Sequence, residues 1–283
     1  MRPPSATWSS TSHHSHYPAE LLAATRDRTI SVCVPARDEA GTIAGIVEPL
    51  VRLRENGVLD QIVVVDASTD GTGDIARRLG AEVYRQRDLM PQFGPVLGKG
   101  DAMWRALSVL SGEVVCFVDA DSEQFGDHFA RGLVGPLVTD PNVRFVKGFY
   151  RRPFRLGSEL EPDGGGRVTE LTARPLLELF YPALASIRQP LAGEIAARRE
   201  LLERLPFATG YAVEIAMLID AWSLVGAGAL AQVDLDVRQN RHQPLSELGP
   251  MAAAVMGAVL SRAGVTDAPV VERPPMASLR AAA

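Results

Sequence analysis

The feature that most constrains this chain is an alternation of short β-branched runs with apolar stripes at helical spacing. Ile30–Val34, Ile62–Val65 and Val114–Val118 read as strands, and the last of them contains no polar residue. A strand of that kind is buried on both faces, which is typical of parallel sheets covered by helices. The alternation therefore predicts right-handed βαβ units and an α/β fold with a doubly wound, mostly parallel sheet.

The ends of the chain differ in composition from its middle. Residues 1–28 are rich in Ser, Thr, His and Pro, and residues 266–283 are rich in Pro and Ala, so both are expected to be flexible tails. Between them we expect a nucleotide-binding half (29–150) and a less regular half (151–265) that share one core. His13, His14 and His16 lie in the first tail, where we interpret them as part of a mobile segment rather than as metal ligands.

Charge and composition exclude several classes of function. The net charge of −5 argues against binding to a nucleic-acid backbone. The sequence contains no run of 18 apolar residues, so no membrane span is predicted, and the N-terminus lacks the apolar core of a signal peptide. Cys33 and Cys116 lie within predicted strands, so we expect two buried thiols and a cytoplasmic protein. Nucleic acids and membranes are thus not expected as partners.

Polar side chains follow the predicted strands where ligands bind in open α/β sheets. Asp119-Ala120-Asp121 comes directly after the buried strand. Two neighbouring carboxylates suit Mg²⁺ or Mn²⁺ shared with nucleotide phosphates, although a solvated turn with Asp121 as a helix cap is the alternative. Lys99 precedes a helical stripe and suits a phosphate, or else is a surface lysine. Gly100 replaces the Ser or Thr of a Walker A loop, and neither a dinucleotide fingerprint nor a hydrolase elbow is present.

A second cluster is rich in glycine. Gly164, Gly165 and Gly166 precede Arg167 and Thr169, a pattern in which backbone amides, a guanidinium and a hydroxyl can bind an anion. A flexible loop with a helix cap is the alternative. Further along, Tyr211 and Glu214 follow Gly210 and suit sugar hydroxyls, although a tyrosine such as Tyr211 more often faces the core.

Together these stretches resemble the retaining GT-A glycosyltransferases, and closely the actinobacterial glucosyl-3-phosphoglycerate synthases. The similarity extends from about Ile30 to Val265. It is carried by PARDE (35–39), GKGDAMWRAL (98–107), VDADS (118–122), VKGFYRRP (146–153), GGGRVTEL (164–171), ARPLL (173–177), QPLAGE (189–194), GYAVEI (210–215) and AQVDLDVR (231–238).

The resemblance implies a GT-A fold whose second half (151–265) binds the acceptor. It implies roles for matching residues: nucleotide binding by Pro35, Ala36, Glu39, Ala120 and Asp119; donor phosphate or ribose binding by Lys99; hexose binding by Tyr211 and Glu214; phosphoglycerate binding by Gly166, Arg167 and Thr169; metal binding by Asp121; and a Leu191 backbone near the reacting centre. Arg37 and Asp66 are also expected beside the nucleotide, at positions where the family has other residues. Family members also often form homodimers, and the apolar helix predicted at Met251–Leu260 is either an interface or core.

The chain departs from the family pattern in three places. Asn240 stands where the family has a metal-binding histidine, and His242 follows two residues later. Either Asn240 binds the ion, or His242 takes over, or metal affinity falls. Asp66 replaces a serine near the base, and Arg37 replaces an apolar residue, so the donor base is less certain than the reaction class.

The resulting hypothesis is a retaining hexosyl transfer from a nucleoside diphosphate sugar, most simply UDP-glucose, to a small anionic acceptor, most simply 3-phosphoglycerate, with Mg²⁺ or Mn²⁺. A sibling transferase that uses GDP-mannose or another phosphorylated acceptor is the main alternative. A sugar-1-phosphate nucleotidyltransferase and a catalytically silent sugar-nucleotide binding protein are the others.

Overall fold

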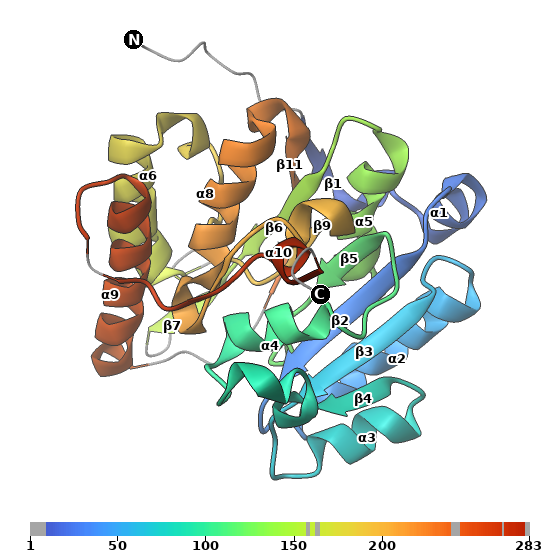
Figure 1. Cartoon of the computed structure of the whole chain (residues 1–283). Helices are drawn as coiled ribbons and strands as arrows, with labels where there is room; N and C mark the ends of the chain where they lie inside the picture. Colours follow the sequence, from blue (N-terminus) through green and yellow to red (C-terminus); the bar gives the residue numbers. More distant parts are fainter. Residues whose placement is uncertain (1–9, 157–158, 162–164, 239–243, 268, 281–283) are drawn as a thin grey trace.

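The computed structural model describes residues 10–156, 159–161, 165–238, 244–267 and 269–280 (Figure 1). The strands are β1 (Ser10–His13), β2 (Ile30–Ala36), β3 (Gln61–Asp66), β4 (Glu82–Arg85), β5 (Val114–Phe117), β6 (Phe145–Arg151), β7 (Phe154–Leu156), β8 (Glu159–Glu161), β9 (Ile195–Arg198), β10 (Phe207–Ala208), β11 (Leu230–Val237) and β12 (Glu272–Arg273). The α-helices are α1 (Ala19–Thr25), α2 (Ile43–Glu55), α3 (Thr72–Arg78), α4 (Lys99–Ala106), α5 (Asp127–Thr139), α6 (Arg174–Phe180), α7 (Arg199–Leu202), α8 (Val213–Val225), α9 (Leu245–Arg262) and α10 (Met276–Arg280).

One eight-stranded sheet runs through both halves of the chain, in the order β1-β11-β6-β9-β5-β2-β3-β4. Neighbouring strands are parallel except at β9, which is antiparallel to both β5 and β6. The prediction of a mostly parallel α/β sheet is confirmed. Strand β9 was not predicted, because its sequence Ile-Ala-Ala-Arg is too short and too rich in alanine to signal a strand.

The sheet separates two hydrophobic cores. Helices α4, α8 and α9 contribute to one core, and α1, α2 and α5 contribute to the other. Because successive strand residues point to opposite faces, Cys33 joins the first core while Val32 and Val34 join the second. Both cysteines are buried free thiols, as expected, and burial raises the pKa of each. None of the helices in the described ranges is long and apolar enough to cross a bilayer.

The prediction of a flexible tail over residues 1–28 is wrong for the described residues that follow Ser9. Strand β1 pairs in parallel with β11 at the edge of the sheet, with Ser10 opposite Ala231 and His13 opposite Asp234. Helix α1 buries Leu22 completely in the second core. Backbone hydrogen bonds hold β1 in place, and these do not require the apolar side chains that a composition reading looks for.

The C-terminal segment is also ordered where the structure describes it. Strand β12 pairs with β10, and the Trp104 ring N–H donates to the Pro274 carbonyl at 2.8 Å. Arg273 forms an ion pair with Asp101 at 2.6 Å, and Arg105 meets the same carboxylate at 3.0 Å. The prediction of a flexible tail over 266–283 is therefore wrong for residues 272–280. Hydrogen bonds and ion pairs to buried groups hold this segment, although it has few apolar side chains.

The segment that follows the glycine-rich cluster starts with a π-helical turn at Thr169–Ala173 and continues as α6. A π-turn widens the helix locally and is frequent at functional sites. Here it follows Gly166, whose φ of +79° lies in the left-handed region that glycine adopts without strain. The π-helical turn thus joins α6 to the glycine-rich loop around Gly166, the candidate site for an anion.

The Asp101 cluster should dominate the stability of this region. Asp101 is fully buried, and replacing it with Ala leaves Arg105 and Arg273 without their shared carboxylate. We expect Asp101→Ala to lower the free energy of unfolding by about 3–5 kcal/mol. Urea denaturation measures this. The exposed Asp74–Arg77 pair is the matched control, and Asp74→Ala should cost less than about 1 kcal/mol. Equal losses would contradict a structural role for the buried cluster.

Candidate active site

The carboxyl ends of the parallel strands place the predicted polar residues along one edge of the sheet. Asp119 and Asp121 follow β5, and Lys99 is the first residue of α4. Gly100 lets this helix lie directly against β10, since a Cβ there would be 1.9 Å from the Ala208 carbonyl oxygen. The close approach brings Lys99 toward the acidic pair.

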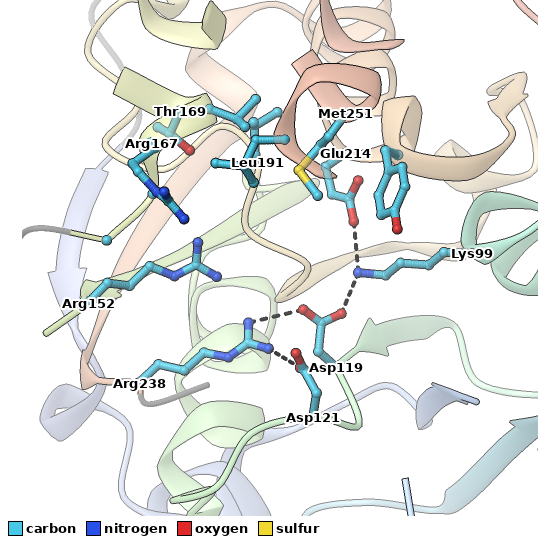
Figure 2. A pocket seen from close by; sticks show the side chains of 15 residues that line it. Lys99, Asp119, Asp121, Arg152, Arg167, Thr169, Leu191, Glu214, Arg238 and Met251 are labelled. Carbon is cyan, nitrogen blue, oxygen red and sulfur yellow. Dashed lines mark hydrogen bonds and ion pairs between the residues drawn. The ribbon is translucent and has the colours of Figure 1, made fainter. Parts of the chain in front are cut away.

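Lys99 lies between two carboxylates that come from distant segments (Figure 2). Its ammonium forms ion pairs with Asp119 and, at 2.8 Å, with Glu214 in the first turn of α8. Burial disfavours the charged ammonium, but the two carboxylates outweigh it and hold the pKa of Lys99 above its usual value. The side chain is therefore a permanent cation at the floor of the cavity.

Arg238 is the main residue that the sequence analysis missed. Its guanidinium, 1% exposed, lies 3.0 Å from an Asp119 oxygen and 2.5 Å from an Asp121 oxygen (Figure 2). It also pairs with the buried Glu194 at 2.7 Å. The available signal was its position directly after β11, whose carboxyl end lies at the same edge of the sheet as that of β5. Arg238 thus fixes the two aspartates in space.

A buried network supports this arginine from behind. The Tyr150 hydroxyl accepts from Arg238 at 2.7 Å and donates to Glu194 at 2.8 Å. Burial raises the pKa of the Glu194 carboxyl, although Arg238 and the hydroxyl oppose this. Burial also raises the pKa of Tyr150, so the hydroxyl keeps its proton. The network orients Arg238 from behind the cavity.

The turn before β9 is pressed against Asp119. A Cβ on Gly193 would lie 2.2 Å from an Asp119 oxygen, so only glycine fits there. Lys147 is buried and donates to the Ala192 carbonyl. Burial lowers the pKa of Lys147 to about 8, against the pull of nearby carboxylates. These contacts hold Leu191 at the wall of the cavity.

Two adjoining cavities share Lys99, Asp119, Asp121 and Tyr211. The larger, about 640 Å³, is lined by the predicted nucleotide residues Pro35, Ala36, Arg37, Glu39 and Ala120. The smaller, about 260 Å³, is lined by Gly166, Arg167, Thr169, Leu191 and Glu214, and also by the unpredicted Arg152, Arg238 and Met251. The acidic pair and the glycine-rich loop therefore face one continuous space, with the guanidinium groups of Arg152 and Arg167 along one wall (Figure 2).

One predicted residue that the structure describes, Asp66, does not join this group. Asp66 is buried, accepts from the Ser68 backbone N–H at 2.9 Å and pairs with Arg85 at 3.3 Å. It is not among the described residues that line the two cavities. Asn240 and His242, the two candidates for completing the metal site, lie outside the described residues, as does Gly164.

The charge balance around Asp119 should appear in acid denaturation. Burial disfavours its carboxylate, but Lys99 and Arg238 outweigh burial and hold its pKa well below the usual value. The ionised group therefore stabilises the fold above about pH 4, and this contribution is lost as the pH falls further. We expect wild type to lose more unfolding free energy than Asp119→Asn between roughly pH 6 and pH 3 in urea titrations. Equal losses in the two proteins would refute the assignment.

Comparisons with known proteins agree with this geometry. Residues 31–159 match glycosyl transferase family 2. Glucosyl-3-phosphoglycerate synthase from Mycolicibacterium smegmatis is 41% identical, with 93% of each chain covered. A crystal structure of the Mycobacterium tuberculosis glucosyl-3-phosphoglycerate synthase in complex with Mn²⁺, uridine-diphosphate-glucose and phosphoglyceric acid superposes with a TM-score of 0.86 at 41% identity, covering 95% of this chain and 98% of that one.

A crystal structure of mannosyl-3-phosphoglycerate synthase from Rubrobacter xylanophilus has a TM-score of 0.87 at 44% identity and covers 95% of each chain. The matching family is one of glycosyl transferases, which transfer a sugar and not a nucleotidyl group, so the nucleotidyltransferase alternative is set aside. The strand order, the acidic pair after β5 and these similarities lead to one assignment: the chain belongs to the glucosyl-3-phosphoglycerate synthases, glycosyltransferases of family 2 with a GT-A type α/β fold.

Proposed function

We propose that this protein transfers glucose from UDP-glucose to 3-phosphoglycerate. The observation that carries the proposal is the continuous space that joins Lys99, Asp119 and Asp121 to Arg167 and Thr169. A donor diphosphate and an anionic acceptor bound at its two ends would meet in the middle. The Mycobacterium tuberculosis structure, which contains uridine-diphosphate-glucose and phosphoglyceric acid, supports this pairing of ligands.

The donor half binds the nucleotide and holds the diphosphate. Pro35, Ala36 and Glu39 line the larger cavity at the end of β2, where a base and ribose would lie. Lys99 is positioned to meet the diphosphate, and its two carboxylate partners keep it charged throughout the reaction. Glu214 and Tyr211 then face the hexose. Lys99 therefore favours departure of the diphosphate by stabilising its developing charge.

The acidic pair fits a hard divalent cation. Asp119 and Asp121 offer carboxylate oxygens, the ligands that Mg²⁺ and Mn²⁺ prefer, and the Asp121 side chain is 43% exposed. When bound there, the ion supplies positive charge that stabilises the leaving diphosphate. Arg238 holds the two carboxylates at a fixed separation and compensates part of their mutual repulsion.

The acceptor end of the cavity is lined by two guanidinium groups and by the backbone of the glycine-rich loop. Arg167 and Arg152 line the same cavity as Gly166 and Thr169. A phosphate or carboxylate accepts two parallel hydrogen bonds from one guanidinium, which fixes the orientation of a small anion. An acceptor held in this way places its hydroxyl toward the donor sugar, so positioning supplies part of the rate acceleration.

We propose that the anomeric configuration of the sugar is retained, and that this happens by attack on the same face of the sugar and not by a double displacement. The described carboxylates that line the smaller cavity are Asp119, Asp121 and Glu214, and each is ion-paired to Lys99 or Arg238. A double displacement would need a carboxylate directed at the anomeric carbon. In the same-face route a diphosphate oxygen assists the acceptor hydroxyl, and the Leu191 backbone lies beside the reacting centre. Trapping a covalent glycosyl-enzyme would contradict this route.

A sibling activity with GDP-mannose as donor is the second candidate. It is favoured by the similarity to the mannosyl-3-phosphoglycerate synthase of Rubrobacter xylanophilus, whose identity to this chain is 44%. Arg37, which lines the larger cavity and departs from the family pattern, is the residue where a change of donor would act. A binding protein without turnover, suggested by Asn240, is the third outcome that the donor test separates.

We further propose a cytoplasmic homodimer. Leu171, Leu179, Leu245 and Met256 are exposed on the π-turn, α6 and α9, and these neighbouring elements form one end of the molecule (Figure 1). Apolar side chains gathered in this way favour an interface. Two free buried thiols, Cys33 and Cys116, suit a reducing compartment.

The donor assignment predicts which nucleotide diphosphate is released. With Mg²⁺ or Mn²⁺ and 3-phosphoglycerate, wild type should release UDP from UDP-glucose faster than GDP from GDP-mannose, and release should depend on the acceptor. Asp121→Ala should abolish metal-dependent turnover because it removes one of the two carboxylates. Faster GDP release would establish the sibling activity, and binding of a sugar nucleotide without release of its diphosphate would identify a silent binding protein.

The acceptor assignment predicts a selective effect of Arg167→Ala. Loss of one charge-assisted pair costs about 1.5–3 kcal/mol, so the KM for 3-phosphoglycerate should rise about 10- to 150-fold while the KM for the donor changes little. Initial rates at varied acceptor and donor measure both constants. Arg144→Ala, which removes an exposed guanidinium paired with Glu200, is the control and should alter neither. Equal increases in both constants would reject the acceptor role.

A further inference from the structure

A second cluster of potential metal ligands lies outside the active-site cavities. His13 ends β1, His14 begins the short helix that follows, and Asp236 belongs to β11. One ligand atom from each of the three lies within 4.8 Å of the other two. The histidine tract looked unsupported in the sequence because its third partner is more than 220 residues away. Parallel pairing of β1 with β11 brings the three side chains together.

The local backbone directs Asp236 toward the two imidazoles. The register of β11 against β6 shifts between Asp234 and Val237, and Asp236 has a φ of +68° in the left-handed region. Such a conformation is uncommon for a residue with a side chain and persists where surrounding contacts hold it. The bulge re-aims the carboxylate, whose two oxygens lie 3.2 Å from His13 Nε2 and 2.6 Å from His14 Nε2.

The surroundings suit a coordinated ion. The side chains of His13, His14 and Asp236 are 38%, 13% and 48% exposed, so the cluster is walled on one side and open to solvent on the other. The ring of His128 covers His14 at a centroid distance of 4.7 Å. Ser15 Oγ lies 2.8 Å from His13 Nδ1 and can accept a hydrogen bond from that nitrogen when Nδ1 carries the ring proton and Nε2 binds an ion.

We propose that His13, His14 and Asp236 form a Zn²⁺ site separate from the Asp119–Asp121 pair. Two imidazole nitrogens and one carboxylate oxygen, with water in the fourth position, are a donor set typical of Zn²⁺. Mg²⁺ and Mn²⁺ prefer oxygen ligands and are expected at the other site. Binding of the ion through Nε2 requires each neutral imidazole to carry its single ring proton on Nδ1, which solvent exchange allows, and it replaces the two hydrogen bonds to Asp236 with coordinate bonds. The ion would tie the first strand to the bulge two residues before Arg238.

The test compares Zn²⁺ binding to the full-length chain and to variants, in excess Mg²⁺ to occupy the oxygen site. Isothermal titration after chelator treatment should give one equivalent of Zn²⁺ for wild type. His14→Ala should weaken binding by at least about 100-fold, because even loss of an outer partner of a zinc ligand costs about 10–100-fold. His16→Ala removes an exposed imidazole of the same tract that lies outside the cluster, and it should bind as wild type does.

Two further measurements keep the test decisive. Zn²⁺ should raise the Tm of wild type and of His16→Ala but not of His14→Ala, since an ion that binds only the folded state stabilises it. If His14→Ala fails to fold, the more exposed His13→Ala replaces it. Co²⁺ in place of Zn²⁺ should give the visible absorption of a tetrahedral nitrogen-ligated site. Equal Zn²⁺ affinity in wild type and in both cluster variants, or binding by wild type that excess Mg²⁺ abolishes, would overturn the proposal.

Discussion

The site depends on one buried guanidinium. Arg238 contacts Asp119, Asp121 and Glu194, three carboxylates that would otherwise repel one another in a poorly solvated space. Burying several charges is costly unless they are paired and hydrogen-bonded, and Tyr150 completes the pairing from behind. With Lys99 on the opposite side of Asp119, the acidic pair is held between two cations. Electrostatic preorganisation of this kind does not have to be rebuilt at each turnover.

The parts of this arrangement that the sequence predicts are local ones. Asp119 and Asp121 follow an all-apolar strand, so their place at a sheet edge follows from the strand itself. Arg167 and Thr169 follow glycines within a few positions. Arg238 was not predicted, because its partners Asp119 and Asp121 lie 119 and 117 residues earlier in the chain and only the strand order brings them together. Sequence spacing carries no information about such pairs, whereas topology does.

The two ends of the chain illustrate the same limit. Ser10–His13 has no apolar side chain, so nothing in its composition predicts a strand, yet an edge strand needs only a partner with free backbone groups. Arg273 lies in a segment rich in proline, and its role follows from the burial of Asp101 beneath it. In both places the error came from interpreting polarity as mobility. Buried or paired polar groups stabilise structure when each has a defined partner.

The pairing of Asp101 with Arg273 also has a consequence for biosynthesis. Asp101 is buried within α4, the helix that begins with Lys99, while its partner is contributed by β12. Strand β1 likewise pairs with β11, which follows much later in the chain. During translation Asp101 therefore emerges with Arg105 beside it but before Arg273 is made, and β1 emerges before the strand with which it pairs. The larger cavity, which Gly210 and Tyr211 also line, is complete only after the segment that contains these two residues has left the ribosome.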